Sequence, residues 1–278
     1  MLLKVKIFFI GVVFIVVFIV AVVVGYRLAT EVGNQTSTQR NVTTTGEIQA
    51  TTEPTYHMQD CDSVQHLVGG NSGVYQIQPI GVLQPFDVYC EMTESGAWTV
   101  IQRRQSGYVG FYRNWDEYKA GFGNIDGEYW IGNDNIILTN QSSYKLRIDL
   151  EKFDGDTAYA EYDAFSVEDE NSNYILHLGN CSGTAGDAMR WNDNTEADGQ
   201  PFTTYDRDND NAVHPIAGAS SNCAQEYHGA WWFNSCSSAH LNGIYYPNED
   251  YEIDSIMWKT WNNFVALKSS TMKIQDTA

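Results

Sequence analysis

The stretch FYRNWDEYKAGFGNIDGEYWIGNDNI, residues 111–136, contains the helix that stands out most clearly in the sequence. Asn114 is a good N-cap, because its side-chain oxygen can accept a hydrogen bond from a backbone N–H of the first turn. Asp116 and Glu117 suit the positive N-terminal end of a helix dipole, and Gly121 is suited to end the helix. The stretch therefore predicts one short helix that begins at Asn114 and stops at Gly121.

Short apolar and aromatic runs alternate with turn residues on both sides of this helix. Alternation of period two, as in Tyr144, Leu146, Ile148 and Leu150, indicates a strand with one buried face. Strands are expected at GVYQIQP (73–79), PFDVYCEM (85–92), AWTVIQRR (97–104), YKLRIDLEKF (144–153), TAYAEYDAFSV (157–167) and NYILHLG (173–179). Strands first and scattered short helices later predict an α+β fold with a loop-rich C-terminal third.

Length and charge limit the possible functions. At 278 residues, 43% of them apolar, the chain is long enough for one large domain or two small ones. Its 35 acidic residues outnumber its 16 basic ones, which gives a formal net charge of −19. A surface so acidic repels phosphates and attracts divalent cations, so we expect no nucleic-acid partner.

The first 25 residues have the composition of a membrane segment. IFFIGVVFIVVFIVAVVV, residues 7–24, contains no charge, and as a helix it would span roughly 27 Å, close to the hydrocarbon core of a bilayer. The run is longer than the core of a cleaved signal peptide, and Lys4 and Lys6 favour a cytoplasmic N-terminus. We therefore expect a short cytoplasmic tail at 1–6 and, at 7–25, the signal anchor of a single-pass type II membrane protein. Cleavage and secretion is the alternative.

Residues 26–59 are rich in threonine, have few large apolar side chains and show no periodicity, which predicts a stalk. The stalk has neither a Gly-x-y repeat nor heptads, so a homo-oligomer would have to form through the membrane segment, the globe or a disulfide. Four N-x-S/T sequons fit an extracellular compartment and are candidate glycosylation sites: Asn34, Asn41, Asn140 and Asn180.

Five cysteines in an oxidising compartment leave one over when two pairs form. Their order and spacing suggest the pairs Cys61–Cys90 and Cys223–Cys236, although spacing alone does not prove connectivity. Each pair would contribute on the order of 3 kcal/mol in the chain-entropy model. Cys181 is then either a buried thiol or the site of an interchain bridge.

Three carboxylates alternate in YDRDNDNAVHPIAGASSNCA, residues 205–224, at Asp206, Asp208 and Asp210. Alternate side chains of an extended loop can converge on calcium, a hard cation that prefers several oxygen ligands. The loop is not an EF-hand, because it lacks the Gly at position six and the Glu at position twelve. By itself, the triplet fits a solvated acidic loop as well as a calcium site.

Catalytic motifs are missing from the sequence. It has no G-x-S-x-G, H-E-x-x-H, Walker loop or G-x-G-x-x-G. Carboxylates are plentiful, but any acidic chain offers candidate glycosidase pairs. We therefore expect a binding protein without catalytic residues.

Ten stretches together resemble a fibrinogen-like domain, the C-terminal globe of fibrinogen chains, ficolins, angiopoietins, tenascins and tachylectin-type lectins. In order from about Asp60 to Ile274 they are FDVYCEM, WTVIQRRQSG, FYRNWDEYKAGFGNIDGEYWIGNDNI, LRIDLEKFDGDTAYAEYDAFSV, SGTAGDAM, FTTYDRDND, NCA, HGAWWFNSC, HLNGIYY and IMWKTWNNFVALKSSTMKI. The resemblance implies a globe at residues 60–275 with a central antiparallel sheet, short helices and a loop-rich C-terminal subdomain that carries calcium and ligand sites. It also implies the two intrachain disulfides suggested above.

On the family pattern, Ca²⁺ takes the side chains of Asp208 and Asp210 and the backbone carbonyls of Ala212 and His214. The segment NAVHPIAGASSN, residues 211–222, departs from this pattern, because the family has only a few residues between the last aspartate and the cysteine of NCA. The insertion affects the two carbonyl ligands and leaves the two carboxylates in place.

In the acetyl-binding lectins of the family, the ligand pocket lies around the second disulfide, and a cis peptide precedes its second cysteine. The positions that match this pocket are Tyr227, His228, Trp231, Ser235, Cys236 and Ser237, and Tyr245 is a candidate for a further aromatic wall. Ser237 stands where these lectins often carry a histidine, which alters one wall of the pocket.

The resemblance implies a calcium-dependent extracellular recognition protein, a lectin-like pattern-recognition receptor of innate immunity for acetylated glycans. The alternative is an adhesion or signalling protein whose fibrinogen-like domain binds a protein receptor through the same face.

Overall fold

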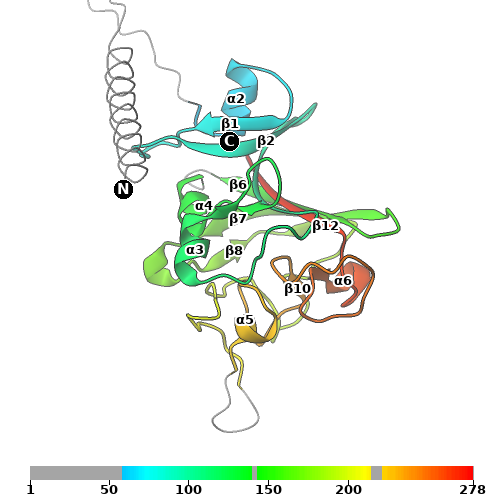
Figure 1. Ribbon diagram of the computed structural model, residues 1–278. Coiled ribbons are helices and arrows are strands. Elements are labelled where there is room, and N and C mark those ends of the chain that lie inside the picture. Colours follow the sequence, from blue (N-terminus) through cyan, green and yellow to red (C-terminus); the bar gives the residue numbers. More distant parts are fainter. Residues whose placement is uncertain (1–57, 140–142, 214–220, 278) are drawn as a thin grey trace, which may run out of the picture. The chain divides into compact units, whose positions relative to one another are not determined.

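A ten-stranded sheet crosses the part of the protein that the computed structural model describes, residues 58–139, 143–213 and 221–277 (Figure 1). Its main path follows the order β1 (Gly73–Ile77), β2 (Phe86–Thr93), β3 (Gly96–Arg104), β12 (Ser269–Asp276), β6 (Tyr144–Glu151), β7 (Thr157–Val167) and β8 (Leu176–Leu178). Neighbouring strands on this path are antiparallel. The six strands expected from the sequence are therefore confirmed, with ends that differ by a few residues.

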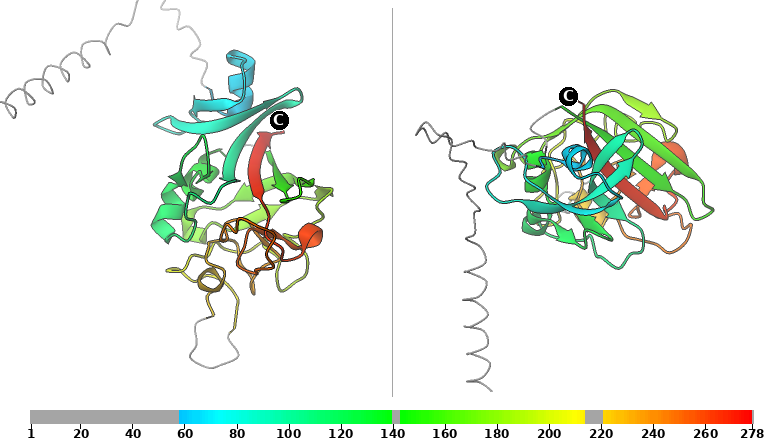
Figure 2. Two further views of the ribbon diagram at one scale, coloured as in Figure 1. Left: turned by 45° about the vertical axis from the view of Figure 1, so that its right-hand side comes forward. Right: turned by 90° about the horizontal axis from the view of Figure 1, so that it is seen from above.

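The C-terminal strand β12 lies in the middle of the sheet, between β3 and β6, and Figure 2 shows it in red among the earlier strands. The short strands β4 (Phe122–Gly123), β5 (Tyr129–Trp130) and β9 (Cys181–Gly183) attach to the sides of the main path. Strands β10 (Ala239–His240) and β11 (Met257–Trp258) form a separate pair. The last strand of the protein thus completes the central sheet.

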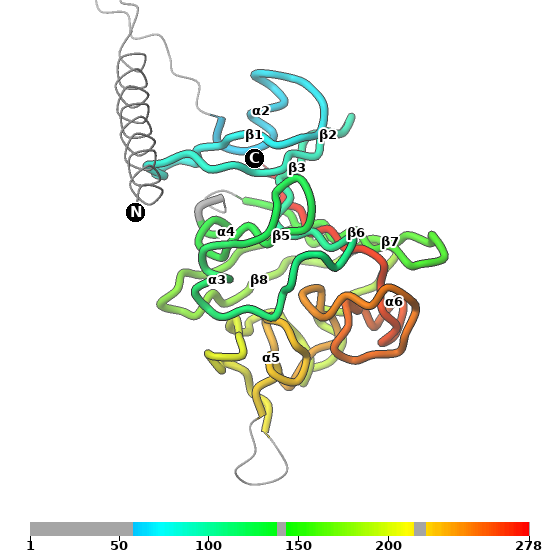
Figure 3. Tube along the Cα trace, viewed as in Figure 1, coloured from blue at the N-terminus to red at the C-terminus, as the bar shows by residue number. Residues whose placement is uncertain are grey.

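The helices of the described residues are short: α2 (Cys61–Leu67), α3 (Trp115–Ala120), α4 (Asn133–Thr139), α5 (Cys223–Glu226), α6 (Lys259–Asn262) and the 3₁₀ turn η1 (Glu170–Ser172). The predicted cap of α3 is present, since the Asn114 side chain accepts a hydrogen bond from Glu117 N at 2.9 Å. Gly121 ends this helix with φ at 89°. Helices α5 and α6 lie on the side of the globe away from α2 (Figure 3).

The core is rich in aromatic side chains that connect the sheet to the C-terminal subdomain. The rings of Trp130 and Phe202 are stacked with centroids 5.9 Å apart, and Phe202 meets Trp232 edge-on at 5.2 Å. Both tryptophans are almost completely buried. The expected α+β fold with a central antiparallel sheet, few short helices and a loop-rich C-terminal part is confirmed.

The membrane topology requires a correction. No helix in the described residues combines the length and the hydropathy that a membrane span needs. The expected single-pass type II localisation, with its membrane contact, is contradicted by this finding and is not retained. The expected tail and anchor, and the stalk up to residue 57, lie outside the described residues.

Candidate functional site: the acidic loop and the Cys223–Cys236 disulfide

The three alternating aspartates have different roles in the structure. Asp206 Oδ1 accepts hydrogen bonds from Trp115 N at 3.0 Å and from Thr204 Oγ1 at 2.7 Å. The Asp206 carboxylate therefore attaches the acidic loop, the segment that contains the three aspartates, to the first residue of α3. This leaves the second and third aspartates of the triplet as the candidates for a bound ion.

Asp210 connects the acidic loop to the disulfide loop. Its Oδ2 accepts a hydrogen bond from Cys223 N at 2.8 Å, and its Oδ1 accepts one from Ala212 N at 2.9 Å. Burial raises the pKa of Asp210 to about 6, and the neighbouring Asp208 carboxylate adds to the increase. A partly buried carboxylate beside a second carboxylate fits a hard divalent cation.

The expected calcium ligands include only two acidic side chains, Asp208 and Asp210. Within residues 58–139, 143–213 and 221–277, no three His, Cys, Asp or Glu side chains gather into a metal cluster. Asp208, Asp210 and Ala212 are among the described residues, whereas His214 lies outside them. Three of the four expected ligands can therefore be located in the structure, and the calcium site itself stays a prediction.

The second disulfide joins Cys223, at the start of α5, to Cys236, with Cα atoms 5.5 Å apart. The peptide bond between Ser235 and Cys236 is cis. Cys61 and Cys90 form the other disulfide, and Cys181 is a free, half-buried thiol. This is the pairing that the cysteine spacing suggested.

A hollow of about 400 Å³ lies beside the second disulfide. Its walls are Ala212, Val213, Ser221, Glu226, Tyr227, Ser235 and Cys236. The hollow thus brings the end of the acidic loop together with three of the expected ligand-binding residues, Tyr227, Ser235 and Cys236. We call it the disulfide hollow.

The other expected ligand residues lie apart from this lining. Trp231 is fully buried and Ser237 is 4% exposed, and the Ser237 hydroxyl donates to Ala239 O at 2.6 Å. Tyr245 lies over Gly107 and donates its hydroxyl to Gln105 O at 3.3 Å. In this conformation Trp231 and Ser237 pack in the core beneath the site and do not line the disulfide hollow.

His240 forms a hydrogen bond with the backbone of Tyr227 from inside the core. It is completely buried, and burial lowers its pKa to about 3, so the imidazole is neutral at physiological pH. Its Nε2 lies 3.2 Å from Tyr227 O, and because a carbonyl only accepts, this nitrogen is the donor. The rings of Tyr227 and Phe233 pack around the imidazole at 6.0 and 5.1 Å between centroids. The wall that Tyr227 forms is therefore held in place.

Tyr112, which the sequence did not indicate, lies beside both Tyr205 and His228. The Tyr112 ring is 4.8 Å from the Tyr205 ring and 5.5 Å from the His228 ring, measured between centroids. His228 Nδ1 lies 3.0 Å from Asp254 Oδ2. Because the three rings come from distant segments of the sequence, no local pattern marks this cluster.

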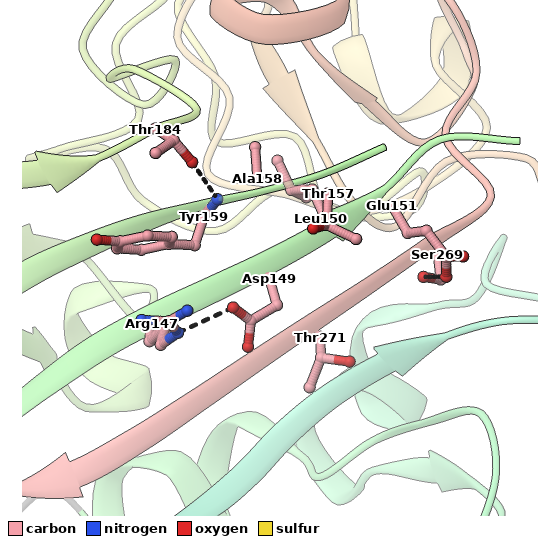
Figure 4. A pocket seen from close by; sticks show the side chains of 10 residues that line it. All are labelled: Arg147, Asp149, Leu150, Glu151, Thr157, Ala158, Tyr159, Thr184, Ser269 and Thr271. Atoms are coloured by element: carbon pink, nitrogen blue, oxygen red, sulfur yellow. Dashed lines mark hydrogen bonds and ion pairs between the residues drawn. The ribbon is translucent and has the colours of Figure 1, made fainter. Parts of the chain in front are cut away.

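A larger hollow of about 510 Å³ lies on the outer face of β6, β7 and β12 (Figure 4). Its charged groups are already paired with one another or with close neighbours. Arg147 Nε lies 2.8 Å from Asp149 Oδ1, and Glu151 Oε1 lies 2.6 Å from Lys268 Nζ. The disulfide hollow is the better candidate, since the residues expected from the sequence converge there.

Among the sequons, only Asn180 lies in the described residues, where it is exposed and its side-chain amide donates to Asp163 Oδ2 at 2.9 Å. Asn34, Asn41 and Asn140 lie outside them. Burial raises the pKa of the neighbouring Cys181 thiol, so this cysteine is a weak nucleophile.

The sequence is similar to a known protein family and to its members. The family model for the C-terminal globular domain of fibrinogen beta and gamma chains matches residues 57–277. Fibrinogen-like protein 1 of Rattus norvegicus is 43% identical over 232 residues, which cover 79% of this chain and 72% of the relative.

Two solved structures are similar as well. The fibrinogen-like globe domain of human ANGPTL2 aligns with a TM-score of 0.73 and 38% identity, over 79% of this chain and 99% of that one. Lamprey fibrin D-dimer, complexed with the peptide Gly-His-Arg-Pro-amide, aligns with a TM-score of 0.73 and 33% identity, over 94% of this chain and 84% of that one.

Proposed function

This protein belongs to the family defined by the C-terminal globular domain of the fibrinogen beta and gamma chains, and we propose that its globe recognises a protein ligand at the disulfide hollow. The observation that carries the proposal is the convergence there of Tyr227, Ser235 and Cys236 with the end of the acidic loop. An extracellular adhesion or signalling role follows from it. We assign no catalytic residues.

Support for a peptide-like ligand comes from a relative and from charge. The lamprey fibrin fragment is complexed with a short peptide that contains arginine. Here the disulfide hollow has Glu226 in its wall, on a protein with a formal net charge of −19. A basic segment of a protein ligand suits this negative field.

Recognition of acetylated glycans is the second candidate. It is favoured by Tyr227 in the lining of the disulfide hollow, a position that matches the pocket of the acetyl-binding lectins of the family. However, Ser237 replaces their histidine, and its hydroxyl is turned inward to Ala239 O. For this reason we place the protein ligand first.

Calcium is part of the proposal as a structural ion. Asp208 and Asp210 would hold it, with the carbonyl of Ala212 and that of His214 as further ligands. The ion would neutralise the partly buried Asp210 carboxylate, which accepts a hydrogen bond from Cys223 N. Calcium would thereby stabilise the acidic loop at the rim of the disulfide hollow.

The test uses soluble protein of residues 56–278. These residues form one compact unit, and the ANGPTL2 globe, with 99% of its residues aligned here, is solved as a separate domain of that extent. Gly-His-Arg-Pro-amide and N-acetylglucosamine are titrated separately in calcium by calorimetry, with Tyr227→Ala as the site variant and Tyr108→Ala as the control. Tyr108 is 93% exposed and does not line the disulfide hollow.

We expect the peptide to bind, Tyr227→Ala to weaken it and Tyr108→Ala to leave it unchanged. Binding of the sugar alone, lost in Tyr227→Ala, would establish the lectin function instead. If neither probe binds, recognition of a basic peptide at this hollow is refuted.

A further inference from the structure

Tyr112, Tyr205 and His228 form a continuous group of rings on the surface, which we call the aromatic platform. Tyr112 lies before α3, Tyr205 lies in the turn closed by Thr204 and Arg207, and His228 follows α5. The planes of Tyr112 and Tyr205 are inclined by 43°, and Tyr112 meets His228 at 62°. Three separate segments thus place their rings side by side.

The platform is exposed to solvent, and hydrogen bonds to neighbouring side chains fix two of its three segments. Tyr112 is 48% exposed, and the His228 side chain is 47% exposed. Gln225 Nε2 donates to Tyr205 O at 2.8 Å, which fixes the turn, while Asp254 holds the His228 ring. Rings fixed in this way lose little conformational entropy when a ligand binds.

Three acidic residues adjoin the platform, one of them in contact with the His228 ring and two of them close in sequence. Asp206 is next to Tyr205, Glu226 precedes His228 by two residues, and Asp254 contacts the His228 ring. These carboxylates give the platform a field that attracts cations.

The cations nearest in sequence to the platform are already neutralised. Arg113 pairs with Glu117 at 2.5 Å, and Arg207 pairs with Glu170 at 3.8 Å and donates to Asn173 Oδ1. The negative field is therefore not cancelled by neighbouring basic side chains.

A guanidinium group fits this surface best. It is planar and weakly hydrated, it stacks on aromatic faces, and it remains charged at every physiological pH. His228 directly follows Tyr227, so one ligand can reach both the platform and the disulfide hollow. We propose that the aromatic platform receives an arginine side chain of the protein ligand, an inference that rests on the function proposed above.

The probe is the pentapeptide Gly-Arg-Gly-Arg-Gly, immobilised on a biosensor, beside the same peptide with citrulline in place of arginine. Citrulline keeps the shape of the side chain and removes its charge. We expect residues 56–278 to bind the arginine peptide and Tyr112→Ala to weaken this binding about three- to tenfold. Tyr112→Phe should retain binding because it keeps the ring, and Tyr108→Ala should match the parent protein.

Equal binding of the arginine and citrulline peptides would overturn the proposal, as would unchanged binding in Tyr112→Ala. Thermal melting of each variant shows whether a loss of binding is only a loss of folding, and chemical shifts of the labelled Tyr112 ring give a readout independent of affinity. Tyr227→Ala separates the two proposals. Suppose that Tyr112→Ala weakens binding of the arginine peptide, whereas Tyr227→Ala leaves binding of Gly-His-Arg-Pro-amide unchanged. The arginine site on the aromatic platform is then supported, and ligand binding at the disulfide hollow is refuted.

Discussion

Arg104 and Glu128 form a buried ion pair, with Arg104 Nε 3.8 Å from Glu128 Oε1 and only 1–2% of each side chain exposed. The Glu128 carboxylate also accepts four backbone hydrogen bonds from residues 105–109, at 2.9–3.1 Å. Arg104 Nη1 donates to the carbonyls of Leu241 and Gly243 at 3.1 and 2.7 Å. The pair therefore attaches the C-terminal subdomain, which carries the disulfide hollow, to strand β3.

We predict that Glu128→Gln lowers the free energy of unfolding by about 3 kcal/mol, because it leaves Arg104 buried without its counter-charge. The neutral amide also presents hydrogens to backbone N–H groups that need an acceptor. Urea unfolding at pH 7 measures the loss. Glu168→Gln is the control, because Glu168 pairs with His177 at the surface and its replacement should change stability little. An equally small change in Glu128→Gln would contradict the prediction.

The stability contribution of Glu128 should depend on pH. Burial by itself would raise the pKa of this carboxyl from its ordinary 4.5, but the four backbone N–H donors outweigh burial and lower the pKa to about 2. The folded state therefore favours the ionised form, so this contribution is complete above pH 4.5 and is lost as the pH falls towards 2. The difference in unfolding free energy between the parent protein and Glu128→Gln should shrink over that range. A difference that stays constant in urea titrations from pH 6 to pH 2.5 would argue against this account.

If Asp208 and Asp210 hold calcium as proposed, the ion should raise the melting temperature of residues 56–278 by about 5 °C or more when it is well above its dissociation constant, because an ion that binds only the folded loop stabilises the folded state. Asp208→Asn and Asp210→Asn should remove this increase, measured by differential scanning fluorimetry in millimolar calcium and in chelator. Asp206→Asn is the matched control. Its carboxylate binds Trp115 N and Thr204, so this variant should melt earlier yet keep the calcium response. Loss of the response only in Asp206→Asn would place the ion elsewhere.

Replacing Ser237 with the histidine of the acetyl-binding lectins should not produce sugar binding. Ser237 is buried, and its hydroxyl donates to Ala239 O and accepts from Ala239 N at 3.2 Å. Ser237→His therefore inserts a large side chain into a packed site and should cost about 2 kcal/mol of stability, without giving retention on immobilised N-acetylglucosamine. Ser237→Ala, which loses the hydroxyl alone, should cost about 1 kcal/mol. A stable Ser237→His protein that the sugar resin retains would show that this position faces the ligand.

Local patterns predicted the elements of this fold well, for identifiable reasons. The α3 helix follows from Asn114 and Gly121, whose capping and φ preferences act within a few residues. The alternation of Leu146, Ile148 and Leu150 reflects which face of β6 is buried. By contrast, the insertion of β12 between β3 and β6 depends on pairing over more than a hundred residues, and period-two alternation does not say which strand is the neighbour.

The candidate site was predicted less completely. Tyr227, Ser235 and Cys236 were placed by family resemblance, and they do line the disulfide hollow. The inward orientation of Ser237 was not predictable, because a small polar residue suits a pocket wall and a buried turn equally well. The membrane localisation expected from the first 25 residues was wrong, since no helix among the described residues is suited to span a bilayer.

The sequence by itself determined the elements, the family and the acidic character of this protein, because capping, alternation and charge are properties of neighbouring residues. Only the tertiary structure decided which aspartates remain available for an ion and which rings meet at the surface. Asp206 is committed to Trp115 N, 91 residues away, and Tyr112 meets Tyr205 and His228 only after the protein has folded. Such contacts arise from packing between distant segments, and their geometry is fixed by the whole core.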